Sequence, residues 1–335
     1  MNWVLFPDDR LRLHGLHWFA EDGEFCRLPQ RVREEVPASV WGLAQHTSGM
    51  RLRFATDSTS LGLRARFNCL TYMNNMPRTG QVGVDLWVDG QYWRPLFPND
   101  QNGDFCGMFF EDLPRQRREI TLYFGLYSPC ELGGIGFDDD CTIEAPTPFA
   151  IEKPVVYYGS SITQGGCAGR AGMAYQAIVS RALNLDFINL GFSGSGRGEP
   201  ILAKTVAEID ASCFVMDWSQ NCPTIEELRE RYEPFLRTVR AAHPQTPIIC
   251  NTPIFGTSEL WGHNSLFEQM REHIREVVGR VMAEGDTKLT LVEGHDLLGP
   301  DDRDGLVDAV HPNDIGFTSM ARGLEPTLRR VLGLK

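Results

Sequence analysis

Two residues near the C-terminus, Asp308 and His311, have the types and spacing of a general base and its orienting acid. They are three positions apart, which lets one short segment present both side chains together. The carboxylate can accept a hydrogen bond from the imidazole, fix its tautomer and stabilise it once it is protonated. A helix cap or a metal ligand are alternative roles for His311, but no second His or carboxylate stands at ligand spacing.

The matching nucleophile would be a small hydroxyl, and one follows an apolar run in the middle of the chain. Residues 158–166 read Tyr-Gly-Ser-Ser-Ile-Thr-Gln-Gly-Gly, and Ser161 is the fourth of them. A glycine and two hydroxyls after a buried strand would place this side chain at the edge of a sheet. Taken alone, the segment is more simply a Ser-rich turn without function. It lacks both the GK[ST] of a P-loop and the last glycine of a G-x-S-x-G elbow.

Two further turns could supply hydrogen-bond donors to a reacting oxygen. The glycine-rich turn at residues 191–198 includes Gly194, and glycine lets a backbone N–H approach a ligand closely. Its spacing is not that of a dinucleotide-binding G-x-G-x-x-G loop. Asn221 ends the segment after another apolar run, and its side chain can donate an N–H. A tight turn and a cap remain the alternatives for these two positions.

The elements that would position these residues differ between the two halves of the chain. Residues 61–67 and 82–88 alternate apolar and polar side chains, and the second run ends in Asp89-Gly90, a hairpin signal. The first half therefore predicts an antiparallel β-sandwich or jelly roll. Prolines at 146, 148 and 154 indicate a linker, so we expect one domain over residues 1–148 and a second over 149–335.

The second half predicts an α/β fold with a doubly wound parallel sheet. Helical stretches, such as 224–242 and 314–332, alternate with short apolar runs. These runs lie at 155–158, 187–190, 213–216, 248–250 and 289–292. In open sheets of this kind, ligands gather at the carboxyl ends of the strands. The turns that carry Ser161, Gly194 and Asn221 follow three of the runs, so we expect them to meet.

In this order, the four segments resemble the conserved blocks of the SGNH hydrolases, also called the GDSL family. Ser161 stands where the family has its nucleophile, and Asp308 and His311 match the terminal Asp-x-x-His. Gly194 and Asn221 match the residues that, with the amide of Ser161, form the oxyanion hole. Two departures are Ser160, where the first block has Asp, and Ser219-Gln220-Asn221-Cys222, where the third block has Gly-x-Asn-Asp.

The first half adds a second resemblance. Gly83-Val84-Asp85-Leu86-Trp87 is similar to the GxDLY signature of a β-sandwich domain that precedes some SGNH hydrolases, with Trp in place of Tyr. Together the two resemblances imply a flavodoxin-like catalytic domain after an accessory sandwich. An aromatic residue in an alternating strand is usually there for packing, which is the alternative for Trp87.

The resemblance implies a serine esterase that forms an acyl-enzyme on Ser161. A sandwich partner domain goes in this family with removal of short acyl groups, acetyl above all, from carbohydrates or other small molecules. Trp218 and Trp261 are candidates for stacking on sugars, although packing is the commoner role of either. The alternatives are an acyltransferase, in which an alcohol replaces water, and a catalytically silent carbohydrate-binding protein.

Composition narrows the possible partners. The net charge of −12 argues against a nucleic-acid surface, which needs clustered Lys and Arg. No apolar run approaches the roughly 20 residues that cross a bilayer, and the N-terminus does not resemble a secretory signal. The nine cysteines form no CxxC pair. We therefore expect a cytoplasmic enzyme that acts on a small-molecule or carbohydrate ester, with no cofactor, no metal and an oligomeric state left open.

Overall fold

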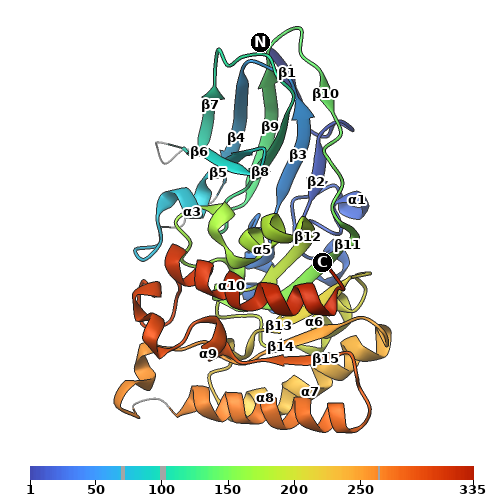
Figure 1. The fold of residues 1–335 in the computed structure, drawn as a ribbon, viewed down its shortest axis with the longest axis vertical. Helices are drawn as coiled ribbons and strands as arrows, with labels where there is room; N and C mark the ends of the chain where they lie inside the picture. The colour runs from blue at the N-terminus through green and yellow to red at the C-terminus, as the bar shows by residue number, and fades with distance from the viewer. Residues whose placement is uncertain (69–71, 99–102, 263–264) are drawn as a thin grey trace.

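The computed structural model describes residues 1–68, 72–98, 103–262 and 265–335. The second half of the chain forms a five-stranded parallel sheet (Figure 1). Its strands follow the order β12-β11-β13-β14-β15, which is the flavodoxin-like 2-1-3-4-5 order, so the predicted fold class is confirmed. The strands are β11 (Ile151–Gly159), β12 (Leu185–Gly191), β13 (Cys213–Asp217), β14 (Ile248–Asn251) and β15 (Leu289–Val292).

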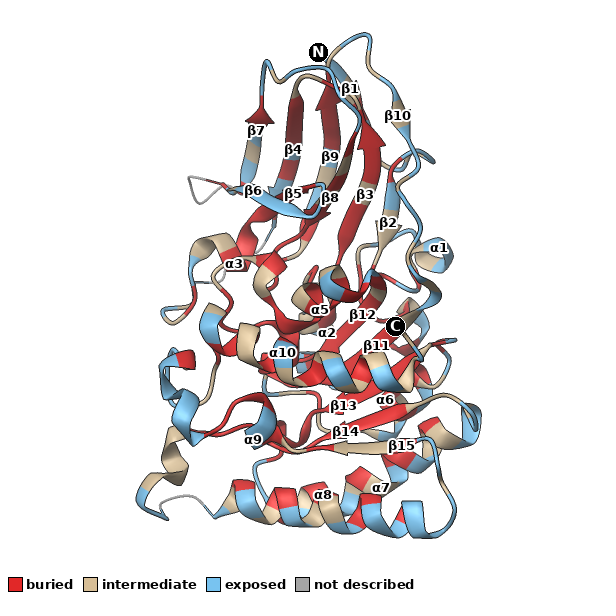
Figure 2. Cartoon of the chain, in the orientation of Figure 1, coloured by how far each residue is buried: buried red, intermediate tan, exposed pale blue. Residues whose placement is uncertain are grey.

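Helices cover both faces of this sheet, so its strands are buried on both sides (Figure 2). One core cluster joins the sheet to α5 (Tyr175–Leu183) and α10 (Asp314–Val331), and another joins it to the helices of the opposite face. Those are α6 (Pro200–Val206), α7 (Ile225–Ala242) and α8 (Leu266–Ala283), while the short α9 (Gly294–Leu297) follows β15. Of the helices described, none is both long and apolar enough to span a bilayer.

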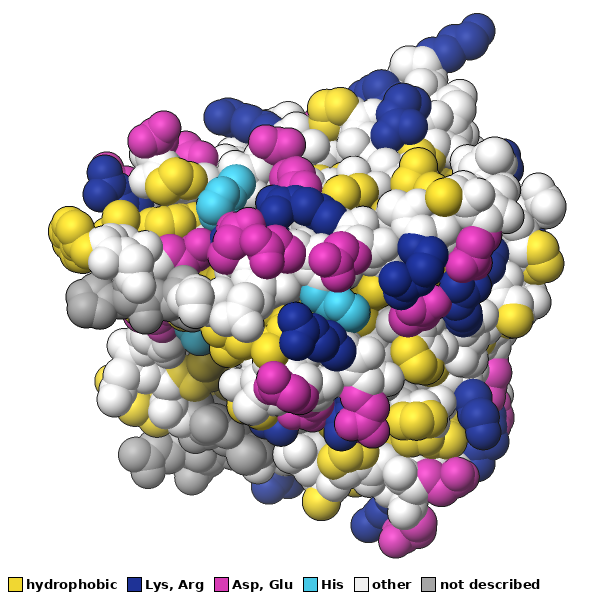
Figure 3. Space-filling view, turned by 90° about the horizontal axis from the view of Figure 1, so that it is seen from below, with side chains coloured by type: hydrophobic (Ala, Val, Ile, Leu, Met, Phe, Trp, Pro, Cys, Tyr) yellow, Lys and Arg dark blue, Asp and Glu magenta, His cyan; other side chains and the backbone are white. Residues whose placement is uncertain are grey.

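Local sequence signals account for where α7 begins and how its outer surface is stabilised. Thr224 caps the helix, because its hydroxyl accepts the N–H of Glu227 at 3.3 Å. Seen from below, acidic and basic side chains are interspersed on the face that carries α7 and α8 (Figure 3). Arg237 pairs with Glu233 on α7, and Arg280 of α8 reaches the same carboxylate. These charges mainly tie the two helices to each other.

The first half forms two antiparallel sheets that pack face to face, as predicted. One sheet has the order β1-β9-β4-β7, and the other has β10-β3-β8-β5-β6 with β2 beside β3. At the expected hairpin, Asp89 and Gly90 have φ of 49° and 75°, the positive values that a type I′ turn requires. The strands are β1 (Asn2–Val4), β2 (Arg12–His14), β3 (Arg51–Thr56), β4 (Leu61–Phe67), β5 (Val84–Val88), β6 (Gln91–Leu96), β7 (Asp104–Phe110), β8 (Arg118–Tyr123), β9 (Cys130–Phe137) and β10 (Ile143–Glu144).

One part of the first half packs away from the sandwich. The segment with α1 (Phe19–Asp22) and α2 (Ala38–Ala44) contributes Trp18, Leu28 and Val40 to the core cluster of the parallel sheet, beside Leu190 and Phe192. The hydrophobic core of the catalytic half therefore includes residues from near the start of the chain. The predicted division at residue 148 remains a prediction from the sequence.

The GxDLY-like strand, β5, lies at the seam between the two halves. The Asp85 carboxylate is buried and accepts the backbone N–H of Gly172 at 3.0 Å. The guanidinium of Arg181, at the end of α5, lies 3.6 Å from the centre of the Trp87 ring. In this chain, the polar and aromatic residues of the motif thus contact the catalytic half.

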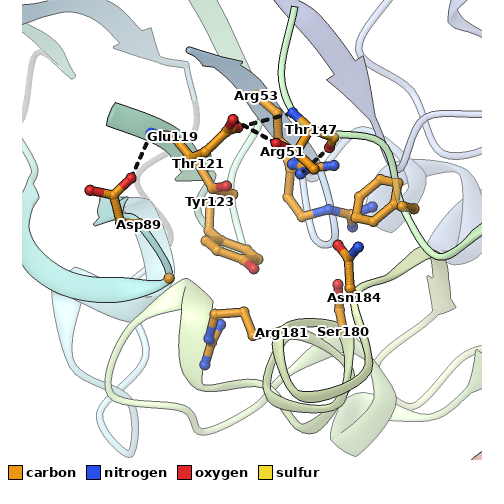
Figure 4. A pocket seen from close by; sticks show the side chains of 12 residues that line it. Arg51, Arg53, Asp89, Glu119, Thr121, Tyr123, Thr147, Ser180, Arg181 and Asn184 are labelled. Carbon is orange, nitrogen blue, oxygen red and sulfur yellow. Dashed lines mark hydrogen bonds between the residues drawn. The ribbon is translucent and has the colours of Figure 1, made fainter. Parts of the chain in front are cut away.

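A cavity of about 430 Å³ opens at the same seam (Figure 4). Several of its charged side chains are bonded to neighbouring side chains or to the backbone. Arg51 pairs with Asp186, and Arg53 donates to the Thr147 carbonyl at 2.9 Å. Glu119 accepts the hydroxyl of Thr147 at 2.7 Å. None of the predicted catalytic residues lines this cavity, so it is not the site that the sequence predicts.

Candidate active site

Ser161 occupies the turn that leaves the carboxyl end of β11. It is the first residue of α4 (Ser161–Gln164), and Ser160 caps this helix by accepting the N–H of Ile162 at 3.2 Å. Glycine is needed before them, because a Cβ on Gly159 would lie 1.9 Å from the Thr163 hydroxyl. As the first residue of a helix, Ser161 has a backbone N–H without an intrahelical acceptor. The residue that replaces the family's Asp therefore shapes the turn as a helix cap.

The structure brings Ser161, His311 and Asp308 into one hydrogen-bonded line. Ser161 Oγ lies 2.9 Å from His311 Nε2, and His311 Nδ1 lies 2.9 Å from Asp308 Oδ2. With the Nδ1 proton directed at Asp308, Nε2 is free to accept the proton of the serine hydroxyl. Residues 150 positions apart thus meet in the arrangement that activates a serine nucleophile.

Asp308 is held as a carboxylate. Partial burial alone would raise its pKa, but several hydrogen bonds outweigh this effect and lower the pKa well below its usual value. The backbone N–H groups of His311 and Val310 donate to Oδ1 at 2.8 and 2.9 Å. The side-chain amide of Asn75 donates to Oδ2 at 2.8 Å, the oxygen that also faces the imidazole. Asp308 is therefore charged and oriented at neutral pH.

Cys167 lies close to Asp308 and His311, so these three side chains could in principle bind a metal ion together. The Cys167 sulfur and the ligand atoms of Asp308 and His311 all lie within 4.8 Å of one another. Burial and the nearby Asp308 charge raise the pKa of the Cys167 thiol to about 12, and a protonated thiol is a poor metal ligand. The two other groups already bond to each other. The donor set therefore suits a serine–histidine pair better than a metal centre.

Gly194 and Asn221 lie together, but they bond to each other and to the turn. The Gly194 N–H donates to Asn221 Oδ1 at 3.1 Å. The Asn221 amide donates to the carbonyls of Phe192 and Gly196, each at 2.9 Å. Gly194 has φ of 64°, and a Cβ on it would meet nothing within 4 Å, so the space beside it is open. Asn221 thus fixes the turn that presents the Gly194 backbone.

A buried carboxyl group, Asp217, lies beneath the nucleophile turn at the end of β13. It accepts the hydroxyls of Tyr175 at 2.9 Å and Thr163 at 3.1 Å. Burial raises the pKa of Asp217 to about 6, although these two hydrogen bonds act in the opposite direction. No motif singles Asp217 out in the sequence, although it opens the segment that contains the predicted donor Asn221.

Two side chains from the β-sandwich half of the chain, called the β domain below, also reach the site, and the sequence did not predict either. The Tyr127 hydroxyl donates to the backbone carbonyl of Ser161 at 3.3 Å, and Asn75 bonds to Asp308. Both contacts join positions far apart in the chain and belong to no motif. The side chain of Ser48 adds a third link, because it donates to the Gln164 carbonyl at the end of α4 at 2.6 Å.

The two tryptophans considered for sugar stacking have different environments. Trp218 is 1% exposed and stacks on Tyr232, with ring centres 5.6 Å apart, so it is a core residue. Trp261 is 88% exposed and lies in the segment that follows β14. Only Trp261 is thus accessible to a ligand in solution.

Comparisons with known proteins match both halves of the chain. Residues 152–329 match the model of the GDSL-like lipase/acylhydrolase family, and residues 1–143 match that of the N-terminus of SGNH hydrolase-type esterases. A search of curated proteins gives no match.

Among solved structures, a GDSL-like lipase from Bacteroides ovatus ATCC 8483 is 30% identical, with a TM-score of 0.90 and coverage of 100% of this chain and 99% of that one. Salicylyl-acyltransferase SsfX3 of a tetracycline biosynthetic pathway is 22% identical, with a TM-score of 0.83 and the same coverage. An acetyl xylan esterase, Est2A, from the rumen bacterium Butyrivibrio proteoclasticus is 14% identical, with a TM-score of 0.67, covering 99% of this chain and 100% of its own.

Proposed function

Because the chain belongs to the GDSL-like lipase/acylhydrolase family and is a serine hydrolase, we propose that Ser161 is its nucleophile and that it removes short acyl groups, acetyl above all, from a carbohydrate or another small-molecule alcohol. The observation that carries this proposal is the line from Ser161 Oγ through His311 to Asp308, with 2.9 Å at each step. The charged Asp308 and the neutral Nε2 of His311 are the protonation states that this chemistry requires.

The proposed reaction proceeds in two steps. His311 Nε2 takes the proton of Ser161 as Oγ attacks the ester carbonyl, and the same proton then passes to the departing alcohol. This leaves an acyl-enzyme on Ser161. His311 next takes a proton from water, which attacks the acyl carbon and releases the acid together with the free serine. Asp308 stabilises the imidazolium in both steps without itself becoming protonated.

The developing oxyanion needs donors on the open side of Ser161. We assign this role to the backbone N–H groups of Ser161 and Gly194 and to the side chain of Asn221. For Gly194, binding of an oxyanion replaces the hydrogen bond to Asn221 Oδ1, which is 3.1 Å long. For the Asn221 side chain, binding of an oxyanion exchanges one of its two hydrogen bonds, to the carbonyl of Phe192 or of Gly196, for one to the oxygen, while the other keeps hold of the turn. Catalytic hydrogen bonds commonly tighten only once the substrate is bound.

The substrate class rests on similarity of fold and on accessible side chains. The acetyl xylan esterase shares this two-part architecture, and the exposed Trp261 offers an aromatic face of the kind that stacks on sugar rings. The fold shared with the salicylyl-acyltransferase supports a second candidate, transfer of the acyl group to an alcohol other than water. Both candidates pass through the same acyl-enzyme and differ only in the acceptor.

The test is hydrolysis of p-nitrophenyl acetate, butyrate and octanoate by the wild type and by Ser161→Ala, followed by acetylated xylo-oligosaccharides. We expect the rate to fall from acetate to octanoate and to be lost in the variant by a factor of about 10³ or more. Added alcohols distinguish the candidates, because a transferase forms a new ester where a hydrolase releases only acid. Unchanged turnover in Ser161→Ala would contradict the assignment.

A further inference from the structure

The loop of residues 72–77 in the β domain contacts the proposed catalytic carboxylate, Asp308. Its Asn75 donates a side-chain N–H to Asp308 Oδ2 at 2.8 Å, and this oxygen lies 2.9 Å from His311 Nδ1. The other oxygen, Oδ1, is held by the backbone N–H groups of Val310 and His311. Asn75 is therefore the donor from outside the Asp-x-x-His segment that fixes the oxygen facing the imidazole.

The loop is shaped by a buried side chain, Gln81. Its amide nitrogen donates to the carbonyls of Met73 at 3.2 Å and Met76 at 2.6 Å, and its amide oxygen accepts the Met73 N–H at 3.1 Å. Gln81 is buried and lies in α3 (Arg78–Val82). One side chain thus bonds to the backbone on both sides of Asn75 and presents that residue in a single orientation.

The helix that carries Gln81 is fixed against the catalytic half. The Thr79 hydroxyl donates to the Gly169 carbonyl at 2.5 Å. Gly80 packs so closely that a Cβ would lie 2.2 Å from the Ala168 carbonyl. The segment it contacts begins at Cys167, whose N–H donates to the carbonyl of Pro312, next to His311, at 3.0 Å. A second route of contacts, besides the hydrogen bond of Asn75, therefore connects α3 to Pro312, next to His311.

We propose that Asn75 is a positioning residue of the active site, supplied by the β domain, whose amide holds the Asp308 carboxylate in the orientation that His311 requires. This inference rests on the proposed function. It makes the β domain part of the catalytic apparatus, because among the residues that the structure describes, removal of Asn75 leaves Oδ2 of this partly exposed carboxylate with only the imidazole to hold it. It also gives the loop a role that requires neither substrate nor cofactor contact.

The test measures how fast a fluorophosphonate modifies Ser161 between about pH 5 and about pH 9, because attack by the serine needs a neutral His311. Asn75→Ala removes the donor, and Asn75→Asp replaces it with a carboxylate. The exposed neighbour provides a matched control, Asn74→Ala. A phosphonate reports on Ser161 whether the natural acceptor is water or an alcohol, so the result does not depend on the identity of the substrate.

We expect Asn75→Ala to slow the modification about 10-fold, as loss of a supporting hydrogen bond generally does. A carboxylate that has lost a donor attracts the imidazolium more strongly, so the acid limb of the profile moves up by about half a pH unit. Asn75→Asp adds a negative charge and moves it further, by about one unit. Burial and the nearby Asp308 charge raise the pKa of Cys167, which also lies beside His311, to about 12, so we expect this thiol to stay protonated over the range of the experiment.

A second variant tests the shaping of the loop. Gln81→Met should reproduce the slower rate and the shifted limb of Asn75→Ala, and the double variant should be no slower than either single one, because both act through Asp308. If both Asn75 variants reacted at the wild-type rate and with the wild-type acid limb of the pH profile, the proposal would be overturned. A lower rate with an unmoved acid limb in both would also overturn it, since it would indicate a merely structural role.

Ser161→Ala separates this proposal from the proposed function. If that variant is not modified while the Asn75 variants behave as wild type, only the positioning role fails. If Ser161→Ala is modified at the wild-type rate, the nucleophile assignment itself is wrong.

Discussion

Individual residues at the site have different roles, and the hydrogen bonds of each side chain indicate its role. Ser161 and His311 face each other with no intervening group, whereas Asn221 uses its amide to hold the turn around Gly194. Asp217 supports the nucleophile turn from below through the hydroxyls of Thr163 and Tyr175. A carboxyl group buried in this way makes stability depend on pH, which can be measured separately from catalysis.

The pH window follows from the pKa of Asp217, which burial raises from 3.8 to about 6. Between these values the folded protein binds a proton that the unfolded chain does not. The free energy of unfolding therefore falls as the pH rises through this window. Asp217→Asn keeps both acceptor contacts and cannot ionise. It should lose this dependence and, above about pH 6, be more stable than the wild type by about 1–3 kcal/mol.

Urea unfolding of wild type and Asp217→Asn at several pH values between about 4 and about 7 would measure this effect. Asp210→Asn is the control, because that carboxylate is exposed and pairs with Lys153 at the surface. If Asp217→Asn kept the wild-type pH dependence, Asp217 would not be protonated in the folded state.

The sequence was sufficient to predict those residues that are recognised from their near neighbours in the chain. Asp308 and His311 are three positions apart, and the Asp89-Gly90 turn needs only its two neighbouring strands, so short-range rules predicted both. Asn75 lies 233 positions from its partner in a loop without a motif, so no pattern indicated the contact. For Trp218 the local sequence was not sufficient. Its position after a strand is compatible with exposure, but tertiary packing buries the side chain.

Among the structural elements, the strands of the parallel sheet matched their apolar runs to within a few residues, because strands buried on both faces are apolar throughout. The packing of α2 was not predicted, since its buried face contacts residues about 150 positions later. Arg27 makes this link specific. Its guanidinium donates to the carbonyls of His46 and Leu43 on one side and of Asn189 and Gly191, at the end of β12, on the other.

Arg27→Met should therefore lower the free energy of unfolding by about 3–5 kcal/mol, because four carbonyls, two of them buried, lose the guanidinium donor at once. The Arg27 side chain itself is 1% exposed. Arg31→Met is the control, since that side chain is exposed and pairs with Glu21 and Glu208 at the surface, and we expect it to cost less than about 1 kcal/mol. Urea titration compares the two, and equal losses would show that the buried network adds nothing.

For the whole molecule, side chains of the sandwich half contact the proposed active site on the parallel sheet. The β domain contributes Asn75, Tyr127 and Ser48 to the surroundings of the triad, and its GxDLY-like strand bonds to the catalytic half through Asp85. The division near residue 148 and the cytoplasmic location remain predictions from the sequence.

The proposed reaction requires Ser161 to be an activated nucleophile, and mapping the site of fluorophosphonate modification by peptide mass spectrometry tests this requirement. We predict one adduct, on the peptide that contains Ser161, absent in Ser161→Ala and formed about 10² times more slowly or worse in His311→Ala. An adduct on another residue, or equal modification of the wild type and Ser161→Ala, would contradict the claim that this triad carries out the reaction.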